Sequence, residues 1–306
     1  MSYEPIHFII NPTSGGGSSG KIWAQARQYI ESILGKFSFE FTGEKGHAIE
    51  LARRASDESK KIIGIGGDGT ISEIVTGVLQ SSKSEVSIGV LNLGTGGDFC
   101  RTLGIKSNFH AGIERIKNGT PNPIDVGRIT YYDFQNKAQE RFFINIAGCG
   151  MAGEVVRTIN KSKKLFGSFS YYLSSVQNLF SYKNKKIHIQ LDENETKEFQ
   201  VVTVAVCNGR YFGGGMQISP IASITDGKFS ITIIEDWNIL EKIFYSSKLY
   251  GKNILTCPKV HSFEARKVII TPSGNQEPVY IDSDGEDIGI IPMTLEVLPG
   301  AVKFII

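Results

Sequence analysis

Three glycine-rich loops lie in the first 104 residues, and each directly follows a short run of apolar residues. They span residues 11–21, 66–70 and 93–104. Apolar residues at helical spacing follow the first two loops, so this part of the chain alternates strands and helices. Such alternation favours right-handed crossovers and a mostly parallel sheet, whose ligand sites lie beyond the carboxyl ends of its strands. The loops are therefore expected to meet at one ligand site.

After about residue 125 the pattern changes to strand-like runs linked by short turns, which predicts an antiparallel β-domain. Helical interruptions are expected near 154–180 and 239–249. The expected strands are 124–132, 139–147, 186–191, 196–207, 228–235, 260–264, 267–271 and 279–281.

Composition excludes several classes of protein. Hydrophobic residues make up 41% of the chain, which excludes wholesale disorder, and a net charge of +2 leaves no global field for a nucleic-acid partner. The four cysteines are far apart and have no C-x-x-C spacing, so we expect reduced thiols. The sequence shows no signal peptide and no apolar run long enough to span a membrane, which indicates a cytoplasmic location.

The first loop contains a G-x-x-x-x-G-K pattern from Gly15 to Lys21, the first part of a phosphate-binding P-loop. Ile22 follows where that motif needs Ser or Thr for magnesium, so the match to this motif is treated as accidental. Two interpretations stay open. The segment is either a flexible loop in which Ser18 or Ser19 caps the next helix, or a loop whose backbone N–H groups hold phosphate.

The second loop, Gly66-Gly67-Asp68-Gly69-Thr70, is more specific. Its glycines let the backbone approach a polyphosphate, and the positive end of the next helix points at that charge. Thr70 suits a helix cap or a nucleotide contact, and Asp68 suits a hydrated magnesium ion. The alternative is an Asp-Gly turn with a structural capping threonine. The third loop repeats the design, so nucleotide phosphates are the expected ligand.

These loops and several later motifs resemble the superfamily of diacylglycerol, sphingosine and ceramide kinases, in particular the soluble bacterial lipid kinases. The likeness covers essentially the whole chain. The motifs are NPTSGG (11–16), GGDGT (66–70), LGTGGDFCRTLG (93–104), DVG (125–127), NIAGCG (145–150), NGRYFGGGM (208–216), DG (226–227) and DGE (284–286).

The resemblance implies a fold, an activity and partners. The fold is a three-layer α/β nucleotide-binding domain with a mostly parallel sheet at 1–125, to which about 292–306 return, and an antiparallel β-sandwich-like domain at 126–291. The activity is ATP- and magnesium-dependent phosphorylation of a lipid hydroxyl, with diacylglycerol favoured and phosphatidic acid as the product. The lipid would be met by transient peripheral contact with the inner membrane surface, and the oligomeric state is left open, with a homodimer included.

The resemblance also assigns roles to individual residues. The proton acceptor is Asp284 or Glu286, with Asp98 nearby. A metal site that is structural falls on Ser223, Asp226 and Lys228, with Asp68 serving the magnesium of the nucleotide. The nucleotide-binding positions are Asn11, Pro12, Thr13, Ser14, Gly15, Thr42, Gly66, Gly67, Asp68, Gly69, Thr70, Ile71, Ser72, Glu73 and Thr95.

Two departures from the family pattern remove a polar group each. Gly97 stands where Asn is usual, and Ala152-Gly153 stands where Asp-Ala is common. An NAD kinase or sugar-phosphate kinase, and a non-catalytic nucleotide- or lipid-binding protein, remain as alternatives. The segment 160–186 mixes lysines with aromatic residues; it is either a core helix with a solvated basic rim or a membrane-surface element, and the second is our preferred membrane contact.

Overall fold

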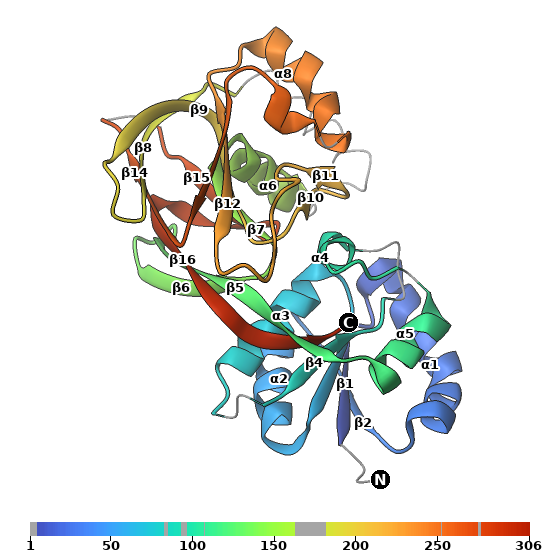
Figure 1. Ribbon diagram of the computed structural model, residues 1–306. Helices are drawn as coiled ribbons and strands as arrows, with labels where there is room; N and C mark the ends of the chain where they lie inside the picture. The colour runs from blue at the N-terminus through green and yellow to red at the C-terminus, as the bar shows by residue number, and fades with distance from the viewer. Residues whose placement is uncertain are drawn as a thin grey trace. The chain divides into compact units, whose positions relative to one another are not determined.

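The computed structural model describes residues 5–82, 85–92, 97–106, 108–162, 182–251, 253–274 and 277–306. The chain divides into two compact units. The first comprises Met1–Val126 with Pro299–Ile306, and the second comprises Gly127–Leu298. Two strands, β5 (Pro121–Tyr132) and β16 (Glu286–Ile305), continue from one unit into the other (Figure 1).

The sheet of the first unit contains four short strands and the last residues of β16, and β5 also pairs with β16. Its order is β2–β1–β3–β4–β16, and each of these neighbouring pairs is parallel. Because parallel strands end at a common edge, the loops that follow β1, β3 and β4 leave the sheet on the same side. The strands are β1 (Ile6–Ile10), β2 (Ser38–Phe41), β3 (Lys61–Ile65) and β4 (Ser87–Val90).

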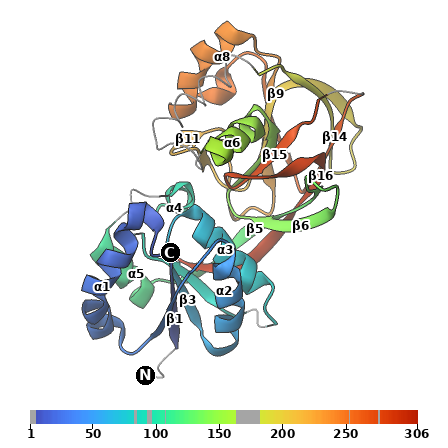
Figure 2. The same ribbon diagram turned by 180° about the vertical axis from the view of Figure 1, so that it is seen from behind.

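Helices cover both faces of this sheet, which explains why its strands are almost continuously apolar. Figures 1 and 2 show α1 and α5 on one face and α2 and α3 on the other. On the first of these faces Trp23 packs against Phe8, with ring centroids 5.2 Å apart. The helices are α1 (Ser14–Leu34), α2 (His47–Glu58), α3 (Asp68–Leu79), α4 (Asp98–Thr102) and α5 (Phe109–Asn118).

Antiparallel pairings in the second unit close on themselves. β9 pairs with β7, β7 with β15, β15 with β16, β16 with β14, β14 with β8, and β8 with β9. β12 and β13 extend this arrangement from β9, and β6 pairs with β5. The strands are β6 (Ala138–Phe143), β7 (Ile146–Gly150), β8 (Lys185–Leu191), β9 (Lys197–Cys207), β12 (Phe229–Glu235), β13 (Val260–Ala265), β14 (Lys267–Pro272) and β15 (Tyr280–Ser283), with a separate hairpin of β10 (Tyr211–Phe212) and β11 (Met216–Gln217).

The main hydrophobic core of the second unit is formed by residues of these ring strands together with residues of β5, β6, β12 and β13. Phe143 and Phe229 are fully buried there, and their rings stack with centroids 5.5 Å apart. Two helices pack on its outside. They are α6 (Met151–Ser162) and α8 (Ile239–Ser246), the latter followed by the short 3-10 helices η1 (Ser247–Tyr250) and η2 (Ile254–Thr256).

The antiparallel β-domain that the sequence predicts is confirmed, with one correction. A single strand over 139–147 is wrong, because the chain turns at Ile144 and Asn145 between β6 and β7. Of the helix expected near 154–180, the structure describes α6 only, and 163–181 lie outside the described residues. In the described part of the chain, no helix is both long and apolar enough to cross a bilayer.

Candidate active site

The first loop is held by the side chain of Asn11. Its Nδ2 donates to the Thr70 Oγ1 at 3.1 Å, and its Oδ1 accepts from the Thr13 N–H and hydroxyl at 3.1 and 2.8 Å. The Asn11 N–H donates to the carbonyl of Ile65 at the end of β3, at 2.8 Å. Asn11 therefore connects the first glycine loop to the second.

The glycine run at 15–17 adopts a left-handed backbone, with φ values of 60°, 68° and 86°. Residues with a side chain rarely adopt this conformation, so the tight turn before the regular part of α1 depends on glycine. The Ser14 hydroxyl donates to the Asn11 carbonyl at 2.9 Å, and its oxygen lies 2.6 Å from the Ser19 hydroxyl oxygen, with which it shares a second hydrogen bond. The carbonyl of Pro12 accepts from the Gly20 N–H at 3.4 Å. Neighbouring polar groups thus fix the predicted nucleotide-binding positions of this loop.

The second loop leaves part of its backbone open. A Cβ added to Gly67 or Gly69 would meet nothing within 4 Å, whereas one added to Gly66 would lie 2.5 Å from the Thr70 Oγ1. Thr70 is 6% exposed and faces Asn11. The accessible part of this loop is therefore the backbone of Gly67 and Gly69 at the start of α3, which suits a phosphate.

The carboxylate of Asp68 reaches the start of α4. Its Oδ2 accepts from the Asp98 N–H at 2.7 Å and its Oδ1 from the Phe99 N–H at 3.2 Å. A Cβ on Gly97 would lie 2.0 Å from the Asp68 Oδ1. The Asp68 carboxylate thus fills the space in which a side chain at position 97 would begin, so a larger residue there would require this carboxylate to move.

Asp98 is 7% exposed and is bonded within its own helix. Its Oδ1 accepts from the Arg101 Nη1 at 2.6 Å, and its carbonyl accepts from the Thr102 hydroxyl at 3.2 Å. Asp68 and Asp98 therefore lie together, because the side chain of one binds the backbone of the other. The sequence does not predict that both carboxylates also stabilise the short helix α4.

Three predicted nucleotide-binding residues have side chains that face elsewhere. Ile71 and Ser72 are 1% and 3% exposed, so their side chains belong to the interior. The carboxylate of Glu73 accepts from the backbone N–H groups of Gly46 and Ala48 at 2.9 and 3.2 Å. Glu73 therefore caps the first turn of α2, and the Ile71 N–H donates to the Gly67 carbonyl at 3.2 Å.

The remaining predicted nucleotide-binding positions are Thr42 and Thr95. Thr42 follows β2, and its N–H donates to the carbonyl of Ile10 at 2.8 Å, which places it beside the end of β1. Thr95 lies outside the described residues.

In the second unit, Asp284 holds the turn between β6 and β7. Its Oδ2 accepts from the Ile144 N–H at 2.8 Å, and its Oδ1 accepts from the N–H groups of Asn145 and Ile146, both at 3.0 Å. Burial raises the pKa of this carboxyl above its usual range, although the three N–H donors act in the opposite direction. Asp284 therefore anchors the turn that the sequence reads as continuous strand.

Two more carboxylates lie on the strands beside Asp284. Glu286 forms an ion pair with Arg141 of β6, and their side chains are 19% and 25% exposed. Asp282 is 7% exposed and accepts from the Gly285 N–H at 2.9 Å. Burial, and then the nearby charge of Asp284, raise the pKa of Asp282 to about 8.

Sequence reasoning missed Asp282 and Arg141. The signal for Asp282 was the run Asp282-Ser283-Asp284-Gly285-Glu286, which carries a carboxylate at every second position. Arg141 gives no such signal, because it is distant in sequence and meets Glu286 only through the fold.

The predicted structural metal site lies in the turn before β12. There the Asp226 Oδ1 accepts from the Lys228 N–H at 3.1 Å, and the Ser223 and Thr225 hydroxyls are 3.3 Å apart. Among the described residues, no group of three His, Cys, Asp or Glu side chains is placed to hold a metal ion. Any ion here would therefore depend on one carboxylate, backbone carbonyls and water.

Most of the segment 160–186, which we predict as the membrane contact, lies outside the described residues. Lys163 and Lys164 lie outside the described residues, and the side chain of Lys161 is likewise not described. At the described end of this segment, the Lys185 Nζ lies 2.6 Å from a Glu277 carboxylate oxygen.

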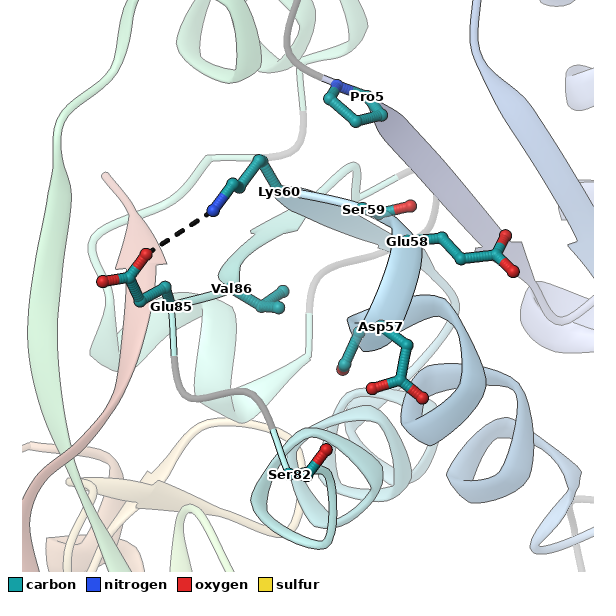
Figure 3. Close-up of a pocket in the computed structure, with 9 residues that line it drawn as sticks. Pro5, Asp57, Glu58, Ser59, Lys60, Ser82, Glu85 and Val86 are labelled. Atoms are coloured by element: carbon teal, nitrogen blue, oxygen red, sulfur yellow. Dashed lines mark hydrogen bonds and ion pairs between the residues drawn. The ribbon is translucent and has the colours of Figure 1, made fainter.

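A pocket of about 430 Å³ lies at the opposite edge of the first sheet (Figure 3). It is lined by residues that directly precede β1, β3 and β4, including Pro5, Lys60 and Val86. The glycine loops follow the other ends of these strands. This pocket is therefore separate from the predicted nucleotide site.

Comparison with known proteins decides the family. A family described as the diacylglycerol kinase catalytic domain matches residues 5–129, and one described as the YegS C-terminal NAD kinase beta sandwich-like domain matches residues 145–306. The diacylglycerol kinase of Bacillus subtilis (strain 168) is 31% identical over 289 residues, which cover 93% of this chain and 90% of that protein. The chain belongs to the diacylglycerol kinase family.

Further relatives agree with this assignment. A diacylglycerol kinase of Staphylococcus aureus (strain bovine RF122 / ET3-1) is 30% identical over 287 residues, covering 93% of this chain and 86% of the relative. The crystal structure of a protein from Bacillus anthracis str. Sterne, titled a putative diacylglycerol kinase, superposes on this chain with a TM-score of 0.79 and 25% sequence identity. The match covers 100% of this chain and 96% of that one. The predicted resemblance is confirmed, and the protein is a phosphotransferase with an alcohol acceptor.

The glycine of the second departure, Gly153, lies against a neighbouring strand, whereas nothing in the structure explains Ala152. A Cβ on Gly153 of α6 would lie 2.2 Å from the carbonyl oxygen of Tyr280 in β15. The alanine common in diacylglycerol kinases at this place would force α6 away from β15. Gly153 therefore permits a closer approach of helix and strand.

Proposed function

We propose that this member of the diacylglycerol kinase family is an ATP- and magnesium-dependent lipid kinase that phosphorylates the hydroxyl of diacylglycerol. The observation that carries the proposal is the polar network of the first unit. Asn11 joins the first loop to Thr70, and Asp68 joins the second loop to the start of α4. A preorganised network at the carboxyl ends of parallel strands suits phosphoryl transfer, in which positioning and charge neutralisation provide most of the rate.

The donor side fits the residues present. The open space beside Gly67 and Gly69 leaves backbone N–H groups accessible to phosphate oxygens. Asp68 and Asp98 provide two carboxylates beside this open backbone. Magnesium binds such carboxylates while keeping several waters. When bound, ATP supplies the γ-phosphoryl group, and magnesium neutralises its charge.

The acceptor side needs a group that takes the proton of the attacking hydroxyl. We assign this role to Glu286, which is partly exposed and is held by Arg141. Asp284 has both oxygens engaged by backbone N–H groups, so we assign it a positioning role for the strands that carry Glu286. Ser223, Asp226 and Lys228 remain our proposed structural metal site, in which Ser223 and Lys228 contribute carbonyl oxygens.

The choice of acceptor rests on the relatives. Those from Bacillus subtilis and Staphylococcus aureus are named diacylglycerol kinases. Diacylglycerol is insoluble in water, so the proposal includes a cytoplasmic protein that visits the inner membrane surface.

The test is incubation with labelled ATP, magnesium and, in turn, diacylglycerol, sphingosine, ceramide, NAD and a sugar phosphate. We expect label in phosphatidic acid, and loss of transfer when a chelator removes magnesium. Label in NAD alone would contradict the lipid assignment. Bound ATP without transfer to any acceptor would instead indicate a non-catalytic binding protein.

A further inference from the structure

The outward side of α8 is apolar. Leu240 and Phe244 are 77% and 70% exposed, and Ile239 and Ile243 are 46% and 44% exposed. Positions 239, 240, 243 and 244 are three and four residues apart, so their side chains share one face of the helix. We call this set the α8 outer face. Single exposed apolar residues are common, but a contiguous apolar patch marks an interaction site.

The helix that carries this face is firmly held on its other side. The Asn238 side chain accepts from the Glu241 N–H at 3.0 Å, and the Glu241 Oε2 accepts from the Asn238 N–H at 2.7 Å, which caps the first turn at both groups. Lys242 is 4% exposed, and its Nζ donates to the Tyr182 carbonyl at 3.0 Å. The Tyr245 ring packs on Trp237 with centroids 5.1 Å apart. The α8 outer face is therefore a fixed, preformed surface.

Charges around the α8 outer face favour an anionic partner. The one carboxylate of α8, that of Glu241, is bonded to the Lys259 Nζ at 3.1 and 3.2 Å, which neutralises it. Lys248 is exposed in η1, directly after the helix, and Lys183 is exposed next to the Tyr182 carbonyl that binds α8. Lys242 is buried and Lys259 pairs with Glu241, so Lys248 and Lys183 are the exposed cations named for this surround. An apolar helix face with a basic surround is typical of helices that lie in a membrane interface.

We propose that the α8 outer face docks the protein on an anionic phospholipid bilayer, with Leu240 and Phe244 inserted below the headgroups and Lys248 among them. The proposal rests on the proposed lipid kinase function, because a bilayer is where such an acceptor resides. A second copy of the chain fits less well. An eight-residue helix is about 12 Å long, too short to supply the ~800 Å² per partner that a stable dimer buries.

The test compares the wild type with a Leu240→Ser/Phe244→Ser double variant and a Lys248→Glu variant. Tyr132→Ser, which removes another exposed aromatic residue of the second unit, is the matched control. Binding is measured by co-sedimentation with vesicles of phosphatidylcholine and phosphatidylglycerol. We expect binding to fall about tenfold or more in the double variant and about fivefold in Lys248→Glu. The control should bind like the wild type.

Activity assays separate this proposal from the proposed function. On short-chain diacylglycerol dispersed without a bilayer, the double variant should match the wild type, and on vesicle-borne diacylglycerol it should be slower in proportion to its lost binding. Unchanged vesicle binding in the double variant would overturn the docking surface, whatever the kinase activity. Loss of a dimer in sedimentation velocity with vesicle binding intact would also overturn it and assign the face to a second copy. A wild type that binds vesicles but phosphorylates no lipid would contradict only the proposed function.

Discussion

Asp68 in the first unit and Asp284 in the second both bind backbone N–H groups of another element, but their surroundings differ. Asp68 accepts two such bonds, from residues 98 and 99 of a short helix, and lies beside loop backbone that is open at Gly67 and Gly69. Asp284 accepts three, from the turn 144–146 between two strands.

This difference separates two uses of a carboxylate. A carboxylate that caps a helix beside open loop backbone lies where a bound ligand can also reach it. One that holds a strand turn with both oxygens, where burial already raises its pKa, has a structural use first. We therefore expect Asp68 to affect catalysis and stability together, and Asp284 to affect mainly stability.

The largest effect is expected for the carboxylate next to Asp284. Glu286→Gln should lower kcat by about a hundred- to ten-thousandfold, because the hydroxyl loses its proton acceptor. Asp284→Asn should instead lower the free energy of unfolding by about 1–3 kcal/mol, since an amide NH2 would face backbone donors. Steady-state kinetics and urea unfolding measure the two effects. Glu296→Gln on β16, which breaks an ion pair with Arg128 of β5, is the control and should leave kcat unchanged.

A normal rate and pH–rate profile in Glu286→Gln would remove it as the base. If Asp284→Asn lost activity without losing stability, the assignments of the two residues would have to be exchanged.

The next effect is that of Asp68→Ala. We expect kcat to fall roughly a hundred- to thousandfold through loss of a preorganised charged group, and stability to fall by about 1 kcal/mol through loss of the α4 cap. Asn108→Ala removes the cap of α5, whose side chain accepts from the Ala111 N–H at 3.0 Å, and is the matched control. It should show the stability loss alone. Wild-type kcat in Asp68→Ala would leave only the capping role.

Gly97→Ala tests the same cap from the other side. The added Cβ would lie 2.0 Å from the Asp68 Oδ1, so the carboxylate must move away from α4. We expect the free energy of unfolding to fall by about 1–3 kcal/mol. We also expect a lower kcat, measured per mole of folded protein. Gly104→Ala, where a Cβ meets nothing within 4 Å but φ is +71°, separates backbone strain from this collision. A neutral Gly97→Ala would show that the Asp68 cap is dispensable.

The smallest effect concerns pH. The pKa of Asp282 is raised from 3.8 to about 8, so the folded protein holds a proton that the unfolded chain releases. The contribution of this bound proton to the free energy of unfolding is complete below 3.8, the pKa of Asp282 in the unfolded chain. It is lost as pH rises through about 8. Asp282→Asn should therefore gain stability relative to the wild type between pH 5 and 9, by on the order of 2 kcal/mol. Parallel pH profiles of urea midpoints for both proteins would contradict the shift.

Much of the fold follows from apolar runs and turns. Lys61–Ile65 coincides with β3, because a strand buried on both faces reads as an unbroken apolar run. The twenty-residue strand β16 was not predicted as a strand, since Pro292 and Pro299 interrupt it and proline usually excludes a central strand. The turn at 144–146 was also missed, because the carboxylate that holds it comes from residue 284.

At the candidate site, the positions of functional residue types were easier to predict than the orientations of their side chains. The loops at the ends of β1 and β3 could be located from glycine and carboxylate spacing. Whether a carboxylate faces a ligand or a neighbouring backbone depends on elements far away in sequence, as the capping of α2 by Glu73 shows. No local pattern carries that information.

The path of β16 has a consequence for how the protein is made. Its residues Lys303 and Phe304 pair with Ser87 and Ile88 of β4, and so extend the first sheet beyond β4. On the ribosome β4 is synthesised early, but the strand that pairs with this side of it emerges only after the entire second unit. Until then β4 exposes unpaired backbone groups that could join another nascent chain. Translation must therefore pass residue 304 before the first sheet is complete. A chain that stops before that point would leave the free side of β4 able to pair with a strand of another chain.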